Sequence, residues 1–331
     1  MTARPHIAYL DQNKWVELAC AVKSPASFPA QHALLKAINR EIDAGHLVLP
    51  ITATNIYETH KINDPERRHE LAVLQATTSR GLVFCGRYRR LEKELNDLWC
   101  VLFDQPHIVH RPHWFLSNIF FEAFADIGDP RMTDLCLTEE TINILRADPI
   151  RPLYEYLVAL SEDVRVEAVK KFTDGSEDLR QRIEKRRCQH AGESLALRRK
   201  IQSALLMINE NELILAFANR AGFTWKSIGE IGDANVRRII EEVPTYYVER
   251  EIALRLEAET RPIEENDFRD MQSFCAVIPY ADEVIGEKHF VNLARQANLD
   301  KKYETRLSTN ILDLAESLER LGATMEPPNS G

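Results

Sequence analysis

The chain has 331 residues, a formal net charge of −9 and a hydrophobic fraction of 44%. This size allows one large or two modest domains with a sizeable core, and the acidic balance argues against a general polyanion binder. We expect a cytoplasmic protein with no membrane association, because no targeting signal or bilayer-spanning apolar run is present. The six scattered cysteines contain no CxxC pair and are typical of reduced thiols.

The first element is an apolar strand that stops at an acid. Residues 6–10 (His-Ile-Ala-Tyr-Leu) read as a strand, Asp11 follows, and an amphipathic helix begins at once. Open α/β sheets place their chemistry at the carboxyl edge of the strands. Asp11 is therefore the first candidate site residue.

The rest of the N-terminal region alternates helices and strands. We expect helices over 28–44, from 54 and from 65, and strands over 47–51 and 81–85. This alternation predicts a mostly parallel sheet covered on both faces.

From about Arg89 the pattern turns helical. Helices are expected over 89–103, 115–126, 138–146, 150–160, 163–172, 177–189, 193–220 and 227–241, with no convincing strand among them. We therefore predict an all-helical insertion over 104–240, between core halves at 1–103 and 241–326. The tail 327–331 (Pro-Pro-Asn-Ser-Gly) is expected to be disordered.

The strand–helix pattern resumes near the C-terminus. Helices are expected over 244–260, 267–277, 289–297 and 311–321, and strands over 283–286 and 305–309. The predicted fold class is thus α/β: a mostly parallel sheet flanked by helices, with a large all-helical insertion.

Acidic residues occur at strand ends and helix starts in both core halves. They are Asp11 and Glu58 in the first half, and Asp267, Asp270, Asp282 and Glu287 in the second. If both halves share one sheet, these carboxylates can meet at its carboxyl edge. Oxygen ligands of this kind suit Mg²⁺ or Mn²⁺. Two such ions can clamp the attacking and leaving oxygens of a phosphodiester.

Four segments together resemble the motifs of PIN-domain nucleases. They are Tyr9–Asn13 with the helix Trp15–Ala19, Leu47–Pro50 with Glu58, Asp270 with the small residues Ser273, Cys275 and Ala276, and Val284–Phe290. The resemblance covers both ends of the chain and leaves out the helical middle. The fourth acid of the family is usually an aspartate after Val-x-Thr, whereas this chain has Gly286 and Glu287, so Asp282 is an alternative. Asp267 and Asp270 lie three residues apart on one helix face, and either fits the third acid.

This resemblance implies a PIN-like fold and metal-dependent hydrolysis of single-stranded or structured RNA. Asp11, Glu58, Asp270 and Glu287 are the implied catalytic set, holding Mg²⁺ or Mn²⁺, with Asp267 and Asp282 as further candidate ligands. Asn13, Arg87, Arg89, Lys288 and Lys14 are the candidates for substrate contact. From the resemblance alone, we also expect that the protein acts as a toxin or defence effector, that it forms a homodimer and that it has a regulatory protein partner.

Other interpretations of the same residues remain open. Asp11 suits a helix N-cap, Glu58 could close a capping box with Asn55, and Asp270 lies in a similar arrangement. The cluster His107, His110 and His113 is more typical of a solvated loop than of a metal site, because Pro106 and Pro112 break any helix.

Two basic segments could bind along the RNA backbone: residues 87–90, which include an aromatic residue, and residues 180–187 with 198–200. The second is interleaved with glutamates and favours a solvated helix face. The alternative functions are a non-catalytic protein-interaction module and a DNA structure-specific nuclease.

Overall fold

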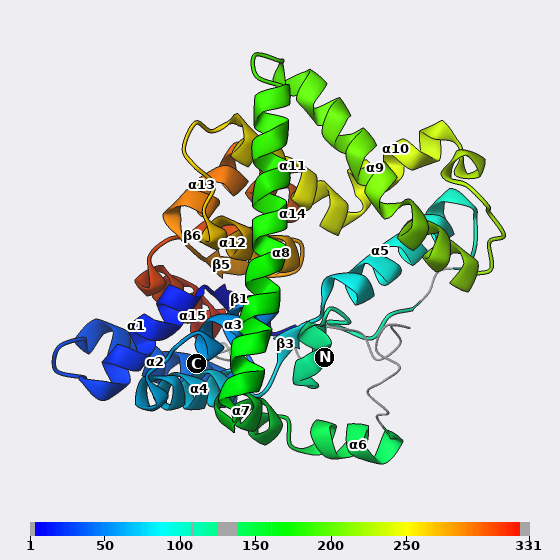
Figure 1. The fold of residues 1–331 in the computed structure, drawn as a ribbon. Coiled ribbons are helices and arrows are strands. Elements are labelled where there is room, and N and C mark those ends of the chain that lie inside the picture. The colour runs from blue at the N-terminus through cyan, green and yellow to red at the C-terminus, as the bar shows by residue number, and fades with distance from the viewer. Residues whose placement is uncertain (1–3, 107–108, 125–137, 160, 325–331) are drawn as a thin grey trace, which may run out of the picture.

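A four-stranded parallel sheet joins the two ends of the chain. The computed structural model describes residues 4–106, 109–124, 138–159 and 161–324. The strand order is β2 (Leu47–Val48), β1 (His6–Leu10), β5 (Glu283–Ile285) and β6 (Arg306–Ser308), with Tyr9 opposite Val284. The predicted parallel sheet built from both core halves is therefore confirmed (Figure 1).

The central strand β1 sends its side chains alternately to two hydrophobic cores, as the pleat of a strand requires. Ala8 and Leu10 enter one core, and Ile7 and Tyr9 enter the other. All four are fully buried. Burial on both faces explains why the strand is a continuous apolar run without polar alternation.

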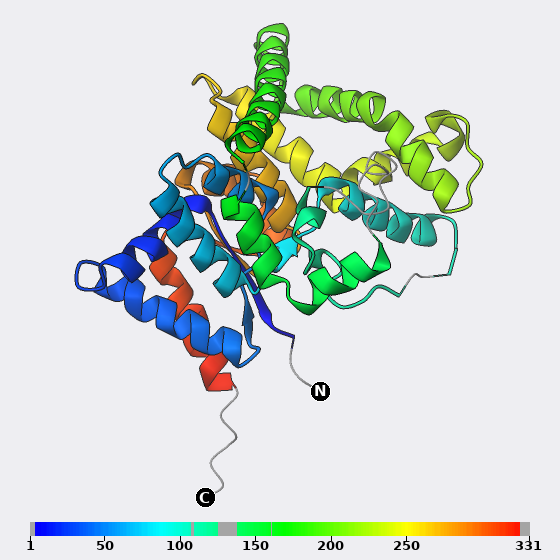
Figure 2. The same cartoon turned by 60° about the horizontal axis from the view of Figure 1, so that its bottom comes forward.

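Helices from distant parts of the sequence cover each face. The first core is covered by α1 (Gln12–Lys23), α2 (Pro29–Asp43), α4 (Pro65–Ser79), α7 (Ile150–Ala159) and α15 (Leu314–Thr324). The second is covered by α11 (Pro244–Ala258), α12 (Glu265–Val277), α13 (Lys288–Gln296) and α14 (Leu299–Tyr303). Figure 2 shows α1, α2 and α15 together on one side of the strands.

A second, two-stranded sheet corrects the prediction of a helix over 115–126. There β4 (Leu116–Ser117) pairs antiparallel with β3 (Val83–Phe84), and the 3₁₀ helix η1 (Phe120–Ala123) follows. Phe115 stacks on Phe84 at 6.4 Å between ring centroids and on Tyr280 at 4.6 Å. These distant partners override the local helical spacing. An isolated parallel bridge between Ile51 and Val83 links β3 to the β2 side of the main sheet.

A third core lies between helices that the predicted boundary at 103 would separate. Leu91 and Trp99 on α5 (Arg87–Leu102) pack with Phe217 on α9 (Leu195–Arg220) and Ile239 on α10 (Asp233–Glu242). In contrast, α7 and β4 join the sheet cores. The residues 104–240 thus do not pack as one separate helical unit, and α6 (Glu139–Ala147) and η3 (Ile228–Ile231) complete this region.

One long helix crosses the core beside the carboxyl edge of the sheet. The helix α8 (Glu162–Gln189) contacts α3 (Ala53–His60), α11 and α12, and it stands out in Figure 1. The two helices expected over 163–172 and 177–189 are therefore continuous. Among the residues described, no helix is both long and apolar enough to cross a bilayer. The predicted tail 327–331 lies outside the described residues.

Candidate functional site

Asp11 lies at the carboxyl edge of the sheet, directly after β1. Its backbone N–H donates to the carbonyl of Ile285 at 2.9 Å, so the ends of β1 and β5 are held together. The residue is 6% exposed and occupies the N-cap position of α1, but its side chain makes no capping hydrogen bond. Burial is the main cause that raises the pKa of Asp11 to about 6, and the charge of Glu287 adds to it.

Glu58 lies in the last turn of α3, within electrostatic reach of Asp11. The capping box of this helix is formed by Thr52 and Asn55, not by Asn55 and Glu58. The glutamate is therefore not needed as a cap. Burial and the nearby charge of Asp11 raise the pKa of Glu58 to about 7.

Asp270 and Glu287 complete the group from the C-terminal half. Asp270 is buried on α12, and Glu287 is exposed at the N-cap of α13, two residues after β5. Burial, the charges of Asp11 and Glu287 and a hydrogen bond with Glu287 raise the pKa of Asp270 to about 10. The four predicted catalytic acids lie within electrostatic reach of one another, and we call them the acid cluster.

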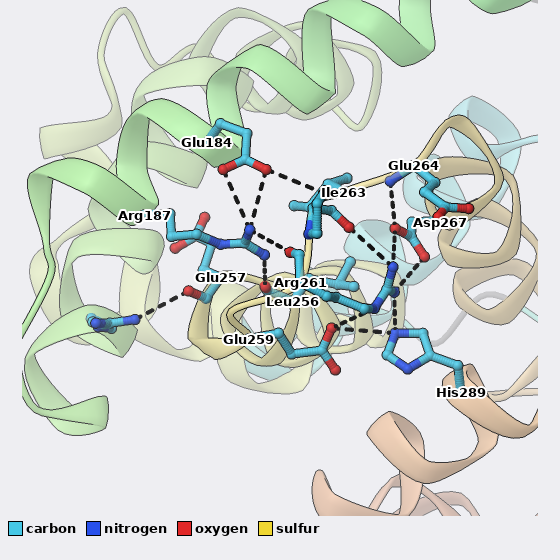
Figure 3. Close-up of polar contacts among 12 residues, drawn as sticks. Glu184, Arg187, Leu256, Glu257, Glu259, Arg261, Ile263, Glu264, Asp267 and His289 are labelled. Atoms are coloured by element: carbon cyan, nitrogen blue, oxygen red, sulfur yellow. Dashed lines mark hydrogen bonds and ion pairs between the residues drawn. The ribbon is translucent and has the colours of Figure 1, made fainter.

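Asp267 does not belong to the acid cluster, which corrects its prediction as a ligand. Both carboxylate oxygens accept hydrogen bonds from Arg261, at 2.9 and 2.6 Å. One oxygen also accepts from the Glu264 N–H at 2.8 Å and closes a capping box at the start of α12. Figure 3 shows Arg261 between Asp267, Glu259 and His289. Asp267 thus serves as a helix-capping residue.

Asp282 lies at the opposite edge of the sheet, so its prediction as the fourth ligand is also corrected. Its carboxylate accepts hydrogen bonds from the Ile7 N–H at 2.8 Å and from Arg4 at 3.0 Å, before β5 begins. Asp11 follows the other end of β1. Because the parallel register pairs Leu10 with Ile285, Asp11 comes level with Gly286, and Glu287 is the next residue along the chain.

The predicted RNA-contacting residues fall into two groups. Arg87 is held by Glu249 at 2.6 and 2.8 Å and by Glu210 at 3.1 Å, and Arg89 pairs with Glu122. These partners neutralise both arginines. Asn13 and Lys288 are exposed in the first turns of α1 and α13, beside Asp11 and Glu287, and Lys14 pairs with Glu17.

The other predicted basic and histidine-rich features have structural partners. In the run 180–187, Arg180 pairs with Glu177 on an exposed part of α8, whereas Arg187, which is mostly buried, pairs with Glu184 and donates to the carbonyls of Leu256 and Arg261, so the expected solvated face holds only for the first part of the run. His110 pairs with Asp97. His107 lies outside the described residues.

Arg269 is the functional residue that the sequence interpretation missed. Its guanidinium lies 3.5 Å from a carboxylate oxygen of Glu58 and 5.7 Å from the ring centre of Tyr57. It is 5% exposed, and its Nε has no hydrogen-bond partner among the described residues. Its charge lowers the pKa of both Asp11 and Glu58, against the effect of burial. The only available signal was an arginine directly before Asp270 on an otherwise buried helix face.

A buried polar network fixes the helices that carry the first two acids. Gln12, next to Asp11, donates to the Thr59 hydroxyl at 3.0 Å and accepts from Asn55 at 3.3 Å and Gln75 at 3.0 Å. The Thr59 hydroxyl donates in turn to Gln75 at 2.8 Å. Because every amide here has a partner, the network holds α1, α3 and α4 in one register and sets Asp11 against Glu58.

The acid cluster offers oxygen ligands, but its side chains are paired differently in the structure. Among the described residues, no three His, Cys, Asp or Glu side chains converge closely enough to hold a metal ion as they stand. Asp270 is instead hydrogen-bonded to Glu287, and Glu58 faces Arg269. The guanidinium thus offsets part of the negative charge that a divalent cation could neutralise. The all-oxygen donor set and its raised pKa values fit Mg²⁺ or Mn²⁺.

Comparisons with known proteins found no relative. No protein-family model, curated protein or solved structure matches the chain. The resemblance to PIN-domain nucleases therefore stays a prediction from the motifs, and the chemistry of the site is inferred from its own residues.

Proposed function

We propose that the chain is a divalent-cation-dependent nuclease that hydrolyses phosphodiester bonds of RNA at the acid cluster. One observation carries this proposal: buried Asp11, half-buried Glu58 and buried Asp270 lie within electrostatic reach of one another at the carboxyl edge of a parallel sheet, and the pKa of each is raised. Keeping several carboxylates together in a low-dielectric place costs folding free energy. A role in cation binding explains why the protein keeps these carboxylates together despite the cost.

Each residue of the cluster has a defined part in this chemistry. Asp11, Glu58, Asp270 and Glu287 would hold Mg²⁺ or Mn²⁺, and because ligating carboxyl groups must be deprotonated, a metal ion would compete with protons for them. A bound divalent ion supplies Lewis-acid activation of water and stabilises the leaving oxygen. Arg269 neutralises the charge beside Glu58, while Asn13 and Lys288 lie at the exposed rim, where a phosphate chain can reach them. The choice of RNA over DNA rests on the motif resemblance.

A cleavage assay with matched variants tests the proposal. Labelled single-stranded RNA is incubated with Mn²⁺ and wild-type protein, Asp11→Asn or the control Asp267→Asn, whose carboxylate belongs to the Arg261 network. Wild type and the control should cleave, Asp11→Asn should lose at least a hundredfold in rate, and a chelator should stop all cleavage. Cleavage that persists in Asp11→Asn or in chelator would refute the mechanism.

The second candidate function is a non-catalytic interaction module, and the present pairing of the acids favours it. If the cluster is only structural, calorimetry at pH 8 should show no saturable Mn²⁺ binding. A binding isotherm that is lost in Glu58→Gln and kept in Asp282→Asn, at the opposite edge of the sheet, would exclude this alternative. A competition between RNA and branched DNA in the cleavage assay separates the two nuclease classes.

A further inference from the structure

The helix α9 is apolar on all sides, but only one side of it is packed. Its inward-facing side enters the third core through Met207, Ile214, Phe217 and Ala218. The helix contacts α11 and α5, and Figure 2 shows it at the outer edge of the molecule. A helix with apolar residues all round is normally buried on every side. The outer face of α9 is therefore unusual, because the described residues leave it largely uncovered.

An apolar stripe runs along this outer face over about 27 Å, at about 1.5 Å per residue. Its members recur with the spacing of one helix side, and they are Leu197, Ile201, Ala204, Leu205, Ile208 and Leu215. Ile208 is 71% exposed and Leu197 is 41% exposed. Ala204 is exposed as well, and the other three are half-buried. A continuous stripe of this kind marks an interaction surface, unlike apolar residues that are scattered singly.

The charges beside the stripe indicate which partner fits it. Arg198 precedes Leu205 by seven residues and Glu212 follows it by seven, so both lie on the same flank of the helix, about two turns from Leu205. Glu212 is exposed and has no ion-pair partner among the described residues. Arg198 donates to the Glu257 carbonyl at 3.3 Å, but no acidic side chain in the described part of the chain pairs with it. One copy of this described chain thus leaves both charges without an ion pair.

A second copy of the same helix supplies both partners. If two α9 helices pack antiparallel with their Leu205 side chains at a two-fold axis, Arg198 of each copy comes level with Glu212 of the other. The same pair then forms twice, as a self-complementary two-fold interface requires. A parallel pair would instead place like charges level with each other, which is unfavourable. The charge pattern therefore favours a second copy of this chain, in antiparallel orientation, as the occupant of the stripe.

We propose that the outer face of α9 is the contact surface of a homodimer with this antiparallel arrangement. The surface lies in the helical middle of the chain, outside the segments that resemble PIN-domain nucleases, and it takes no part in the proposed chemistry. The inference is therefore independent of the nuclease proposal. A contact through one helix of this length is small for a specific interface, so the dimer should dissociate on dilution.

Sedimentation velocity over a wide range of protein concentration tests the contact. The wild type should pass from monomer to dimer as the concentration rises. Ile208→Glu should weaken the dimer about a hundredfold, because it places charges in the centre of the apolar contact. The matched control is Ile144→Glu, which alters another exposed isoleucine, 63% exposed, on α6, and should leave the dimer unchanged. Thermal melting of each variant verifies that it folds.

A charge exchange tests the antiparallel alignment. Glu212→Arg should weaken the dimer about tenfold, because it brings arginines of the two copies together. Arg198→Glu combined with Glu212→Arg should restore the affinity to within about threefold of the wild type. Three results would each overturn the inference: a wild type that stays monomeric at every concentration, an Ile208→Glu variant that dimerises as well as Ile144→Glu, or an exchange variant that binds no more tightly than Glu212→Arg alone.

Discussion

Replacing Arg269 by Gln should destabilise the protein in a way that depends on pH and on divalent cations. The guanidinium lies 3.5 Å from Glu58, and at an effective dielectric constant of about 20 this distance corresponds to about 5 kcal/mol of Coulomb attraction. Protonation limits the loss, because the carboxyls of the variant can take up protons instead. Each pKa unit of further shift corresponds to about 1.4 kcal/mol. We therefore expect a loss of about 3 kcal/mol at pH 8 and about 1 kcal/mol at pH 5.5.

The cation dependence follows from the same charges. Without Arg269, the acid cluster has lost an internal cation that competes with a metal ion. Mn²⁺ should thus bind more tightly to Arg269→Gln than to the wild type, and it should restore a larger share of the unfolding free energy. Denaturant unfolding at both pH values, with and without Mn²⁺, measures these differences.

Arg250→Gln is the matched control. Arg250 is also buried, pairs with Glu251 at 2.9 Å and lies 5.1 Å from the ring centre of Tyr247, but it belongs to α11 and does not touch the acid cluster. Its loss should cost stability without any Mn²⁺ effect. Equal destabilisation of Arg269→Gln at pH 8 and pH 5.5, together with an unchanged response to Mn²⁺, would refute the reasoning.

Three further predictions follow from the same region. Asp11 and Glu58 have folded-state pKa values of about 6 and 7, raised from 3.8 and 4.5, so their protonated forms favour folding and that contribution disappears as the pH rises through about 4–7. In chelator, Asp11→Asn should therefore be more stable than the wild type, and the difference in unfolding free energy should grow by about 2 kcal/mol between pH 4.5 and 7.5. A difference that stays constant with pH in urea melts would contradict this. Gly286→Ala should cost about 1–3 kcal/mol, because the added methyl would lie 2.7 Å from the fully buried ring of Phe274; an unchanged melting temperature would show that the ring can move. Gln12→Leu should cost about 1–3 kcal/mol by leaving its buried partners on α3 and α4 unpaired, which chemical denaturation can measure against an exposed Asn13→Leu control.

The sequence predicts the parts of the fold whose signals are local. The apolar run before Asp11 identifies a strand buried on both faces, and the acid after it identifies the carboxyl edge. The strand β4 has no such signal: two residues, Leu116 and Ser117, pair with a strand some thirty residues earlier, and the stacked rings around Phe115 add to this pairing. The third core is equally hidden, because α5 meets α9 through contacts that span more than a hundred residues.

Tertiary contacts also decide which of the predicted acids belong to the acid cluster. Asp267 and Asp270 occupy similar positions in the sequence pattern. They differ because Arg261, from the loop before α12, donates hydrogen bonds to both carboxylate oxygens of Asp267. Asp282 and Glu287 flank the same short strand, and only the register with β1 decides which of them comes beside Asp11. Alternation and capping patterns contain neither kind of information.

The placement of β5 between β1 and β6 has a consequence for the newly made protein. Asp11 is synthesised some 260 residues before its neighbours Asp270 and Glu287, and β6 follows them. Pairing over such separations is slow. A chain that stops short of α12 therefore carries only Asp11 and Glu58 of the four acids, so the acid cluster forms only when the two halves of the sheet have paired.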